Sequence, residues 1–302
     1  MTQTWNWLGP VTACLASPLL FGFIVRVKAL FSGRKGAPIL QVYSDLFKLL
    51  RKGAVYSETT TIIFRLGPAI SLGATMMALL FIPAFGLPAP AAFPGDFLVF
   101  CGCLGLARFA TVLAAMDTGS AFEGMGASRE VVFSALAEPA MFLALAALAH
   151  ASGDMSLSGM LGDLSEAAPG TAGLVAVLVA GTVLVVLLAE NARIPVDDPT
   201  THLELTMIHE VMVLDHSGSD LAAITYASGL KLWVFSAILV GTVLPVRTGS
   251  LLGDAALWIG TLGAVVVLVG IIESVMARLP LHHVPRLLVG AGVLSAVAML
   301  LG

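Results

Sequence analysis

The amino-acid sequence predicts an all-α integral membrane protein that crosses the bilayer about eight times. Of its 302 residues, 58% are apolar and only 11% are charged, whereas soluble domains average roughly 45–50% and 25%. Apolar runs of about 20 residues, the length needed to span a membrane as a helix, recur eight times. They lie at about 8–31, 61–82, 97–116, 131–150, 171–190, 221–246, 255–277 and 285–301. We interpret residues 1–302 as a single polytopic membrane domain with polar loops at about 32–60 and 190–220.

The placement of basic residues predicts the orientation of these spans, because short cytoplasmic loops collect Lys and Arg. Residues 1–7 hold no basic side chain, whereas residues 26–65 hold eight. The alternate connections around 83–96 and 151–170 carry acidic side chains and no basic one. We therefore expect an even number of spans with both termini outside.

The first polar loop contains an amphipathic helix by its spacing of apolar residues. Leu40, Tyr43 and Leu46 recur at helical intervals and continue into Phe47 and Leu50, with basic residues on or near the other side. Such a segment is expected to lie in the plane of the membrane interface. It could serve as an anchor to anionic lipid or as a docking helix for a partner protein, and the periodicity leaves both alternatives open.

Several charged residues fall within the predicted spans, where each costs about 2.5–3.5 kcal/mol on insertion scales. They are Arg108, Glu138, Glu190 and Lys231, with Arg129 at the start of the fourth span. Intramembrane charges usually face a polar interior and mark ion pathways, so they predict a proton route. Static pairs that lock helices together are the alternative.

Three further acidic residues near span ends have simpler interpretations. Glu273 is expected to pair with nearby Arg278. Asp117 and Glu123 are expected to be solvated loop charges.

The second polar loop, residues 190–220, is predicted to hold a cytoplasmic helix. Asp198 can serve as its N-cap and Pro199 suits the first helical position, while Ser217 and Gly218 would end it. The loop is rich in acidic residues, including Glu204 and Glu210, so it is either a docking surface or a proton-handling surface.

His202, His209 and His216 recur every seven residues along that predicted helix. Metal ligands on a helix usually have closer spacing, so no metal site is expected. Surface or hydrogen-bonded histidines are the default interpretation, with proton exchange as the alternative because histidine titrates near neutral pH.

The residues alone favour a non-catalytic membrane protein. The sequence holds no phosphate-binding glycine motif, nucleophile elbow or cysteine cluster for a redox centre. A transporter, a proton-conducting subunit and the anchor of a peripheral enzyme all remain compatible with this pattern.

The run AENARIPVDDPTTHLELTMIHE resembles the loop between the fifth and sixth spans of the subunit 1 family of respiratory complex I. The resemblance rests on Glu190, Asn191, Arg193, Pro195 and Asp197, with Val196 where the family has phenylalanine. Three other matches extend it along the chain. They are LELT with Glu204, the Arg129–Glu138 pair nine residues apart in the fourth span, and Asp45 with Lys48 in QVYSDLFKLLRKG.

Within that family, RIPVDDPTTHLELTMIHE is most similar to the formate hydrogenlyase subunit 4 branch of membrane-bound hydrogenases. The resemblance implies a subunit of an ion-translocating complex in the cytoplasmic (inner) membrane of a bacterium or archaeon. Its expected partners are a hydrogenase large-subunit-like protein, an iron–sulfur small-subunit-like protein, antiporter-like membrane subunits and the lipid bilayer, with no nucleic acid. The nickel–iron centre and the iron–sulfur clusters are expected in the partners and not on this chain.

Together, the intramembrane charges, the polar loops and the resemblance give two sets of candidate residues. The candidate coupling path comprises Arg108, Arg129, Glu138, Glu190, Arg193, Asp197, Glu204, Glu210 and Lys231. The candidate docking residues are Asp45, Lys48, Asp198, His202 and His209.

The leading hypothesis is a membrane anchor that couples redox chemistry in a peripheral arm to proton or sodium translocation. The alternatives are the quinone-site subunit of an NADH:quinone oxidoreductase, although the departures in the second polar loop count against quinone, and a purely structural anchor. A separate solute carrier is a weaker alternative.

Overall fold

The computed structural model describes residues 2–162, 171–197, 207–244 and 248–302. Among these residues, eight helices are long and apolar enough to cross a membrane. They are α1 (Leu8–Phe31), α3 (Ile62–Leu79), α4 (Asp96–Asp117), α5 (Ala121–Ser152), α7 (Thr171–Glu190), α8 (Gly218–Val243), α9 (Leu251–Val275) and α10 (Val284–Leu301). The shorter elements are η1 (Thr2–Trp7), α2 (Gln41–Leu50), α6 (Leu157–Gly162) and η3 (Glu210–Val213). The predicted all-α membrane fold is confirmed.

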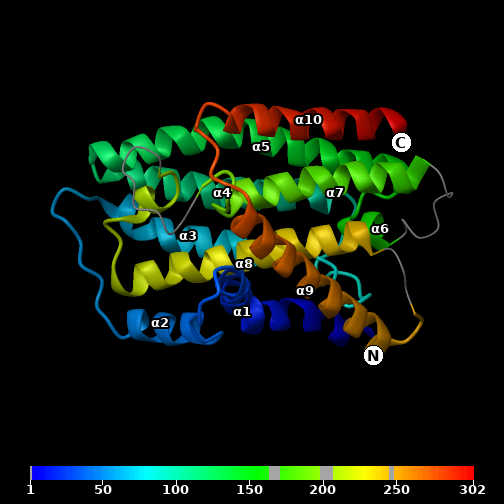
Figure 1. Ribbon diagram of the computed structural model, residues 1–302, viewed down its shortest axis with the longest axis horizontal. Coiled ribbons are helices and arrows are strands. Elements are labelled where there is room, and N and C mark those ends of the chain that lie inside the picture. Colours follow the sequence, from blue (N-terminus) through cyan, green and yellow to red (C-terminus); the bar gives the residue numbers. More distant parts are fainter. Residues whose placement is uncertain (1, 163–170, 198–206, 245–247) are drawn as a thin grey trace.

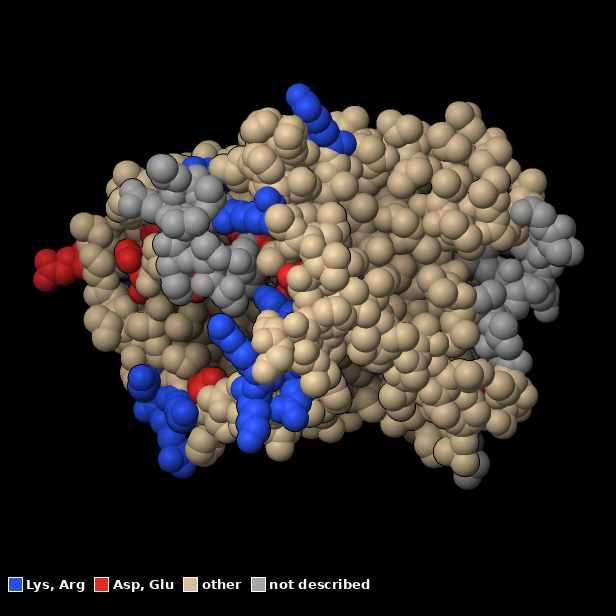
Figure 2. All heavy atoms as spheres, viewed as in Figure 1, with Lys and Arg blue, Asp and Glu red and all other residues tan. Residues whose placement is uncertain are grey.

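The long helices run side by side along the long axis of the molecule, with α9 crossing them obliquely (Figure 1). Both chain ends and α6 lie at one end of this bundle, here called the terminal end, whereas α2 lies toward the other, the loop end. Figure 2 shows Lys, Arg, Asp and Glu side chains gathered toward the loop end and nearly absent from the opposite half of this face. On this face the basic side chains lie mostly toward the loop end (Figure 2), and the cytoplasmic orientation of that end stays a prediction.

Helix α8 is the centre of the bundle. Two thirds of its most apolar window (67%) is buried, compared with 50% or less for every other candidate span among the described residues. It lies between α1, α3 and α7. A buried helix tolerates few charges, so its Lys231 must find a partner inside the protein.

Small and hydroxylated residues bring the outer helices into contact. A Cβ on Gly67 of α3 would lie 2.7 Å from the Cβ of Ala114 on α4, so glycine permits this close approach. Ser295 of α10 donates a hydrogen bond to the carbonyl of Ala140 on α5 (2.9 Å), and Thr182 of α7 donates to the carbonyl of Ala291 on α10 (3.1 Å). Interhelical hydrogen bonds of this kind hold helices together in lipid, where hydrophobic burial contributes little.

The predicted amphipathic helix is present as α2. It packs on α1 and α8, and its Tyr43 hydroxyl donates to the carbonyl of Leu15. Leu46 is buried, whereas Phe47 and Leu50 are exposed. The guanidinium of Arg51 lies 4.2 Å from the centre of the Phe47 ring. Docking to lipid or to a partner stays a prediction for this helix.

Two charges expected to be solvated are instead part of the structure. Asp117 accepts hydrogen bonds from the backbone N–H groups of Thr61 and Phe64, which fixes the first turn of α3 against the end of α4. Glu123 is 1% exposed and accepts a hydrogen bond from the N–H of Asp215. The prediction of solvated charges was wrong because each carboxylate satisfies backbone donors that would otherwise have no partner.

The predicted helix in the second polar loop is only partly testable. Its first residues, including Asp198, lie outside the described residues. From Met207 to Ser217 the chain forms the single 3-10 turn η3 rather than a continuous α-helix. The N–H groups of Ile208 and His209 donate to the Asp197 carboxylate at 3.2 Å, which replaces a helical bonding pattern at that point.

Candidate functional site

Helix α7 ends inside the bundle. Its last residue, Glu190, pairs with Arg108 of α4 and Lys231 of α8. At about 1.5 Å per residue, Arg108 lies about 18 Å from the N-terminal end of α4, and Lys231 lies about 20 Å from the N-terminal end of α8. The connection that follows therefore begins near the middle of the neighbouring helices rather than at the membrane surface.

Residues 191–197 have an irregular backbone, but several of its N–H groups make hydrogen bonds. The N–H groups of Asn191 and Arg193 donate to the carbonyls of Leu187 and Leu188, and Ala192 has a positive φ of 51° that ends the helix. Non-helical backbone at this depth is tolerated only where protein buries it. The connection thus carries its charged side chains into the interior.

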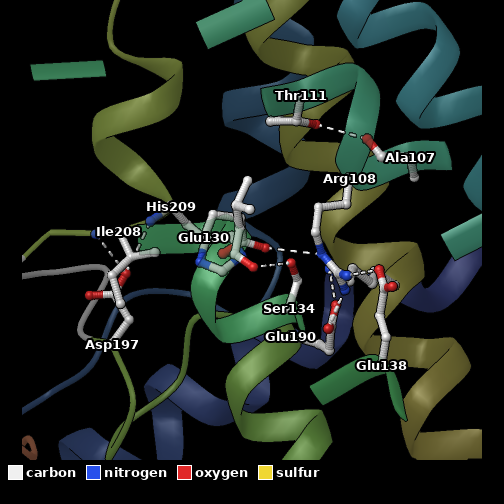
Figure 3. A network of polar contacts seen from close by, with 12 residues as sticks. Ala107, Arg108, Thr111, Glu130, Ser134, Glu138, Glu190, Asp197, Ile208 and His209 are labelled. Atoms are coloured by element: carbon white, nitrogen blue, oxygen red, sulfur yellow. Dashed lines mark hydrogen bonds and ion pairs between the residues drawn. The ribbon is translucent and has the colours of Figure 1, made fainter. Parts of the chain in front are cut away.

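Arg108 is the centre of a buried ion cluster (Figure 3). Its side chain is 7% exposed and points at three carboxylates. Nε lies 3.1 Å from Oε1 of Glu130, Nη1 contacts Glu138, and Nη2 contacts Glu190. Lys231 Nζ lies 2.7 Å from the second oxygen of Glu190. We name Arg108, Glu130, Glu138, Glu190 and Lys231 the Arg108 cluster.

The Arg108 cluster has more acidic than basic groups. Three carboxylates face two cations, so the cluster carries one net negative charge when all are ionised. It borders a cavity of about 610 Å³ between α4, α5, α7 and α8, and Arg108, Glu138 and Glu190 all contribute to its wall. The Glu138 side chain is 53% exposed. A cavity of that size has room for water, which can carry protons to and from the carboxylates.

A second ion cluster lies around Glu273 of α9. Its two oxygens pair with Arg193 Nη1 at 3.1 Å and with Lys28 Nζ at 2.9 Å. Glu273 was expected to pair with Arg278, and this prediction was wrong because Arg278 instead donates to Asp197 at 2.8 Å. We name Lys28, Arg193 and Glu273 the Glu273 cluster.

Asp197 connects the end of the buried connection to the segment beyond the undescribed residues. One oxygen accepts from Arg278, and the other accepts from the backbone of Ile208 and His209. Arg129 of α5 donates to the carbonyl of Met207 at 2.8 Å. The segment is thus held by α5 through Arg129 and by the connection after α7 through Asp197.

The structure separates the predicted coupling residues into groups. Arg108, Glu138, Glu190 and Lys231 meet in one cluster, whereas Arg193 belongs to the other. Arg129 and Asp197 bind the backbone of the loop segment, and their coupling roles stay predictions. Glu210 begins η3. Three predicted residues lie outside the described residues, namely Asp198, His202 and Glu204.

The predicted docking residues are also dispersed. Asp45 and Lys48 lie on α2 as an exposed pair 3.4 Å apart, with Gln41 donating to Asp45. His209 instead lies beside the Arg108 cluster, 3.4 Å from Glu130. Their docking roles stay predictions.

Sequence reasoning gave Glu130 and Lys28 no role in the site, and it gave Arg278 the wrong partner. Glu130 precedes Glu138 by eight residues, which places the two carboxylates near one side of a helix, and this spacing was an available signal. Lys28 was counted only for orientation, since nothing in the sequence links it to a residue in the seventh span.

The described residues do not fit a metal centre. Nickel–iron and iron–sulfur centres need several soft ligands around one point. In the described part of the chain, no group of three or more His, Cys, Asp and Glu side chains could hold a metal ion. Cys14, Cys101 and Cys103 are free thiols.

The cavity does not fit a quinone either. Its charged lining residues, Arg108, Glu138 and Glu190, are already engaged with one another. Quinone carbonyls would need hydrogen-bond donors that are not committed in this way.

Known proteins are similar to this chain over nearly its whole length. A family model described as NADH dehydrogenase matches residues 7–301. Hydrogenase-4 component C of Escherichia coli (strain K12) is 31% identical over 303 residues, covering 97% of this chain and 94% of that protein. Formate hydrogenlyase subunit 4 of the same organism is 28% identical over 282 residues, covering 90% and 89%.

A solved structure shows the same fold. It is that of the membrane-bound sulfane sulfur reductase, an archaeal respiratory membrane complex, and one of its chains matches with a TM-score of 0.83. The match covers 98% of this chain and 97% of that chain at 21% identity.

Proposed function

The chain belongs to the NADH dehydrogenase family, and we propose that it is the membrane subunit of a complex I-related hydrogenase of the formate hydrogenlyase type. In this role it anchors a peripheral redox arm and couples redox chemistry there to proton or sodium translocation. The chain carries no redox centre of its own in this proposal. The nickel–iron centre and the iron–sulfur clusters belong to hydrogenase-like partners, and antiporter-like subunits lie beside it in the cytoplasmic membrane.

The observation that carries the proposal is the charge imbalance of the Arg108 cluster. Two buried carboxylates, Glu130 and Glu190, and the half-exposed Glu138 share two cations beside a cavity of about 610 Å³. An uncompensated buried charge is costly, so a proton or another cation has to balance the third carboxylate. A charge change nearby shifts where that proton resides, and this is the elementary step of an ion pathway.

The cluster is also connected to the loop end. Glu130 contacts His209, and Asp197 holds the backbone of His209. A partner that docks at the loop end and changes its charge therefore acts on groups one contact away from Arg108.

A purely structural anchor is the second candidate. It is favoured by the fact that Glu130, Glu138 and Glu190 each have a cationic partner within the bundle. The two functions differ in what a charge-neutral substitution does. A static cluster loses stability, whereas a pathway loses ion movement at intact assembly.

The test is Glu138→Gln in the intact complex, purified with its co-purifying subunits and reconstituted in vesicles. Gln keeps the shape and removes the titratable group, so we expect redox turnover and subunit composition to persist while ion movement per turnover is abolished. Glu58→Gln, on the exposed connection between α2 and α3, is the matched control and should behave like wild type. Wild-type ion movement in Glu138→Gln would remove Glu138 from the path, and loss of assembly alone would favour the structural anchor.

A further inference from the structure

The segment from Met207 to Val211 is clamped against the loop-end half of α5. Arg129 donates to Met207, and the Asp197 carboxylate binds the N–H groups of Ile208 and His209. Gly126 lets the segment approach closely, because a Cβ there would lie 2.2 Å from Cγ1 of Val211 and 2.9 Å from the carbonyl oxygen of Ile208. The clamp fixes where the His209 side chain points.

That side chain points at the Arg108 cluster (Figure 3). His209 Nε2 lies 3.4 Å from Oε2 of Glu130, whose other oxygen faces Arg108. The His209 side chain is 27% exposed and that of Glu130 is 6% exposed, so the pair joins a partly accessible ring to a buried carboxylate. Among the described residues, neither ring nitrogen makes a hydrogen bond.

The negative charge of the Arg108 cluster explains what a proton on His209 would do. An imidazolium at His209 supplies the third cation that the three carboxylates lack. Histidine is the side chain that ordinarily gains and loses charge between about pH 5 and 8. Its position, rather than its residue type alone, makes it a candidate for delivering a proton.

We propose that His209 is the protonatable bridge through which the loop end exchanges protons with the Arg108 cluster. This inference rests on the proposed ion-coupling function and names a residue that controls it. In the forward step the Nε2–H bond breaks and an O–H bond forms at Oε2 of Glu130, so imidazolium and carboxylate become neutral imidazole and carboxylic acid. The reverse step recharges both groups, and no other reactant is needed.

The charged groups around His209 are of both signs. Glu130 on α5 stabilises the imidazolium, and Asp197, itself paired with Arg278, lies at the backbone of His209. Arg129 on α5, bound to Met207, and Glu210, the next residue, add one charge of each sign. His216, in the same segment, stacks on Phe64 at a ring-centre distance of 3.9 Å and faces no cluster carboxylate.

The first test replaces His209 in the reconstituted complex and follows ion movement per turnover across pH 5 to 8. For wild type we expect this ratio to depend on pH across that range, because histidine ordinarily gains and loses its charge there. In His209→Gln the ratio should be low and independent of pH at intact redox turnover. The exposed His282→Gln is the control and should keep the wild-type profile.

The second test separates proton exchange from simple charge compensation. His209→Lys keeps a positive charge beside Glu130 but does not release its proton in this pH range. We expect wild-type assembly and stability with coupling still lost. Wild-type coupling in His209→Lys would show that only the charge matters and would overturn the exchange step.

A third pair of variants moves the histidine without removing it. Gly126→Ala pushes the clamped segment away from α5 and should reduce coupling as His209→Gln does. Gly124→Ala, where a Cβ meets nothing within 4 Å, is the matched control. If His209→Gln does not assemble, this pair decides the question, and wild-type coupling in Gly126→Ala overturns the proposal.

Comparison with Glu138→Gln separates a failure of the His209 proposal from a failure of the proposed coupling function. If Glu138→Gln abolishes coupling while His209→Gln keeps the wild-type pH profile, His209 is not the bridge and the proposed function stands. If both variants keep wild-type coupling, the coupling function itself fails.

Discussion

The Arg108 cluster and the Glu273 cluster are built from the same kinds of side chain but have opposite charge balance. The first has three carboxylates for two cations, and the second has one carboxylate for two cations. None of Lys28, Arg193 and Glu273 lines the cavity beside Arg108, whereas three members of the Arg108 cluster do. The two clusters therefore differ both in net charge and in whether they border the cavity.

Because of this difference, we expect the two clusters to have different roles. The Glu273 cluster links α1, α9 and the connection after α7, and its two cations outnumber its single carboxylate. A carboxylate in excess, beside a cavity large enough for water, can bind and release a proton. The Glu273 cluster is expected to hold the structure, and the Arg108 cluster to respond to its neighbours.

Removing Arg108 should have the largest effect. Arg108→Met leaves Glu130 and Glu138 without their described cationic partner and leaves Glu190 with only Lys231. Breaking a buried pair by removing one partner costs about 3–5 kcal/mol, so we expect the chain to accumulate poorly or to unfold at a much lower temperature. The measurement is the amount of chain in the membrane together with thermal unfolding of the purified complex.

Arg286→Met is the control for that experiment, because Arg286 is exposed at the loop-end start of α10. It should leave accumulation and unfolding unchanged. Wild-type unfolding of Arg108→Met would mean that the three carboxylates are already neutral, and the charge comparison between the clusters would be wrong.

Glu273→Gln should have a smaller effect and one of a different kind. It leaves Arg193 buried without its carboxylate, while Lys28, whose side chain is 27% exposed, can turn toward water. We therefore expect a lower unfolding temperature but a wild-type ratio of ion movement to redox turnover. Glu190→Gln is the matched variant in the Arg108 cluster, and it should lower that ratio.

The two substitutions together decide whether the clusters differ in function. Loss of coupling in Glu273→Gln at wild-type stability would place Glu273 on the ion path. Wild-type coupling in both variants would make the two clusters equally structural.

Much of the fold could be predicted because apolar length and helical periodicity are local properties. The eight spans and α2 follow directly from runs and spacings in the sequence. Intramembrane charges such as Arg108 and Glu138 were also identifiable, since charge at that depth is costly without a partner. What local patterns do not contain is the identity of the partner.

The pairs that were missed all join distant parts of the chain. Glu273 was expected to pair with Arg278 because they are near in sequence, but the recessed end of α7 brings Arg193 to Glu273 and Asp197 to Arg278 instead. The backbone of Asp215 reaches Glu123 across 92 residues. The pairings of Arg193 and Asp197 depend on where α7 stops, and no residue spacing in the sequence predicts that depth.

Labelling of cysteines would sharpen the contrast between the cavity and the rest of α4. Cys101 contributes to the cavity wall and Cys103 does not, although both are partly buried on the same helix. If water fills the cavity, a small membrane-impermeant thiol reagent should modify Cys101 faster than Cys103 in single-cysteine variants. The measurement is the modification rate by mass spectrometry, and equal rates would argue against a water-filled cavity beside Glu138.

The smallest expected effect concerns His216, which belongs to the same segment as His209 but to neither cluster. Burial lowers the pKa of His216 more than the carboxylates of Asp220 and Asp215 raise it. The unfolded chain therefore binds this proton at higher pH than the folded chain does. Its contribution to stability is full above the ordinary titration range of histidine and is lost as the pH falls through that range.

His216→Phe tests this prediction because a phenylalanine ring can keep the stack on Phe64 and does not bind a proton. We expect wild type to unfold at a lower temperature as the pH is lowered from 8 to 5, and the variant to show a weaker pH dependence with wild-type coupling. A change in coupling would instead connect His216 to the Arg108 cluster. Burial of His216 against Phe64 would then not be enough to separate its role from that of His209.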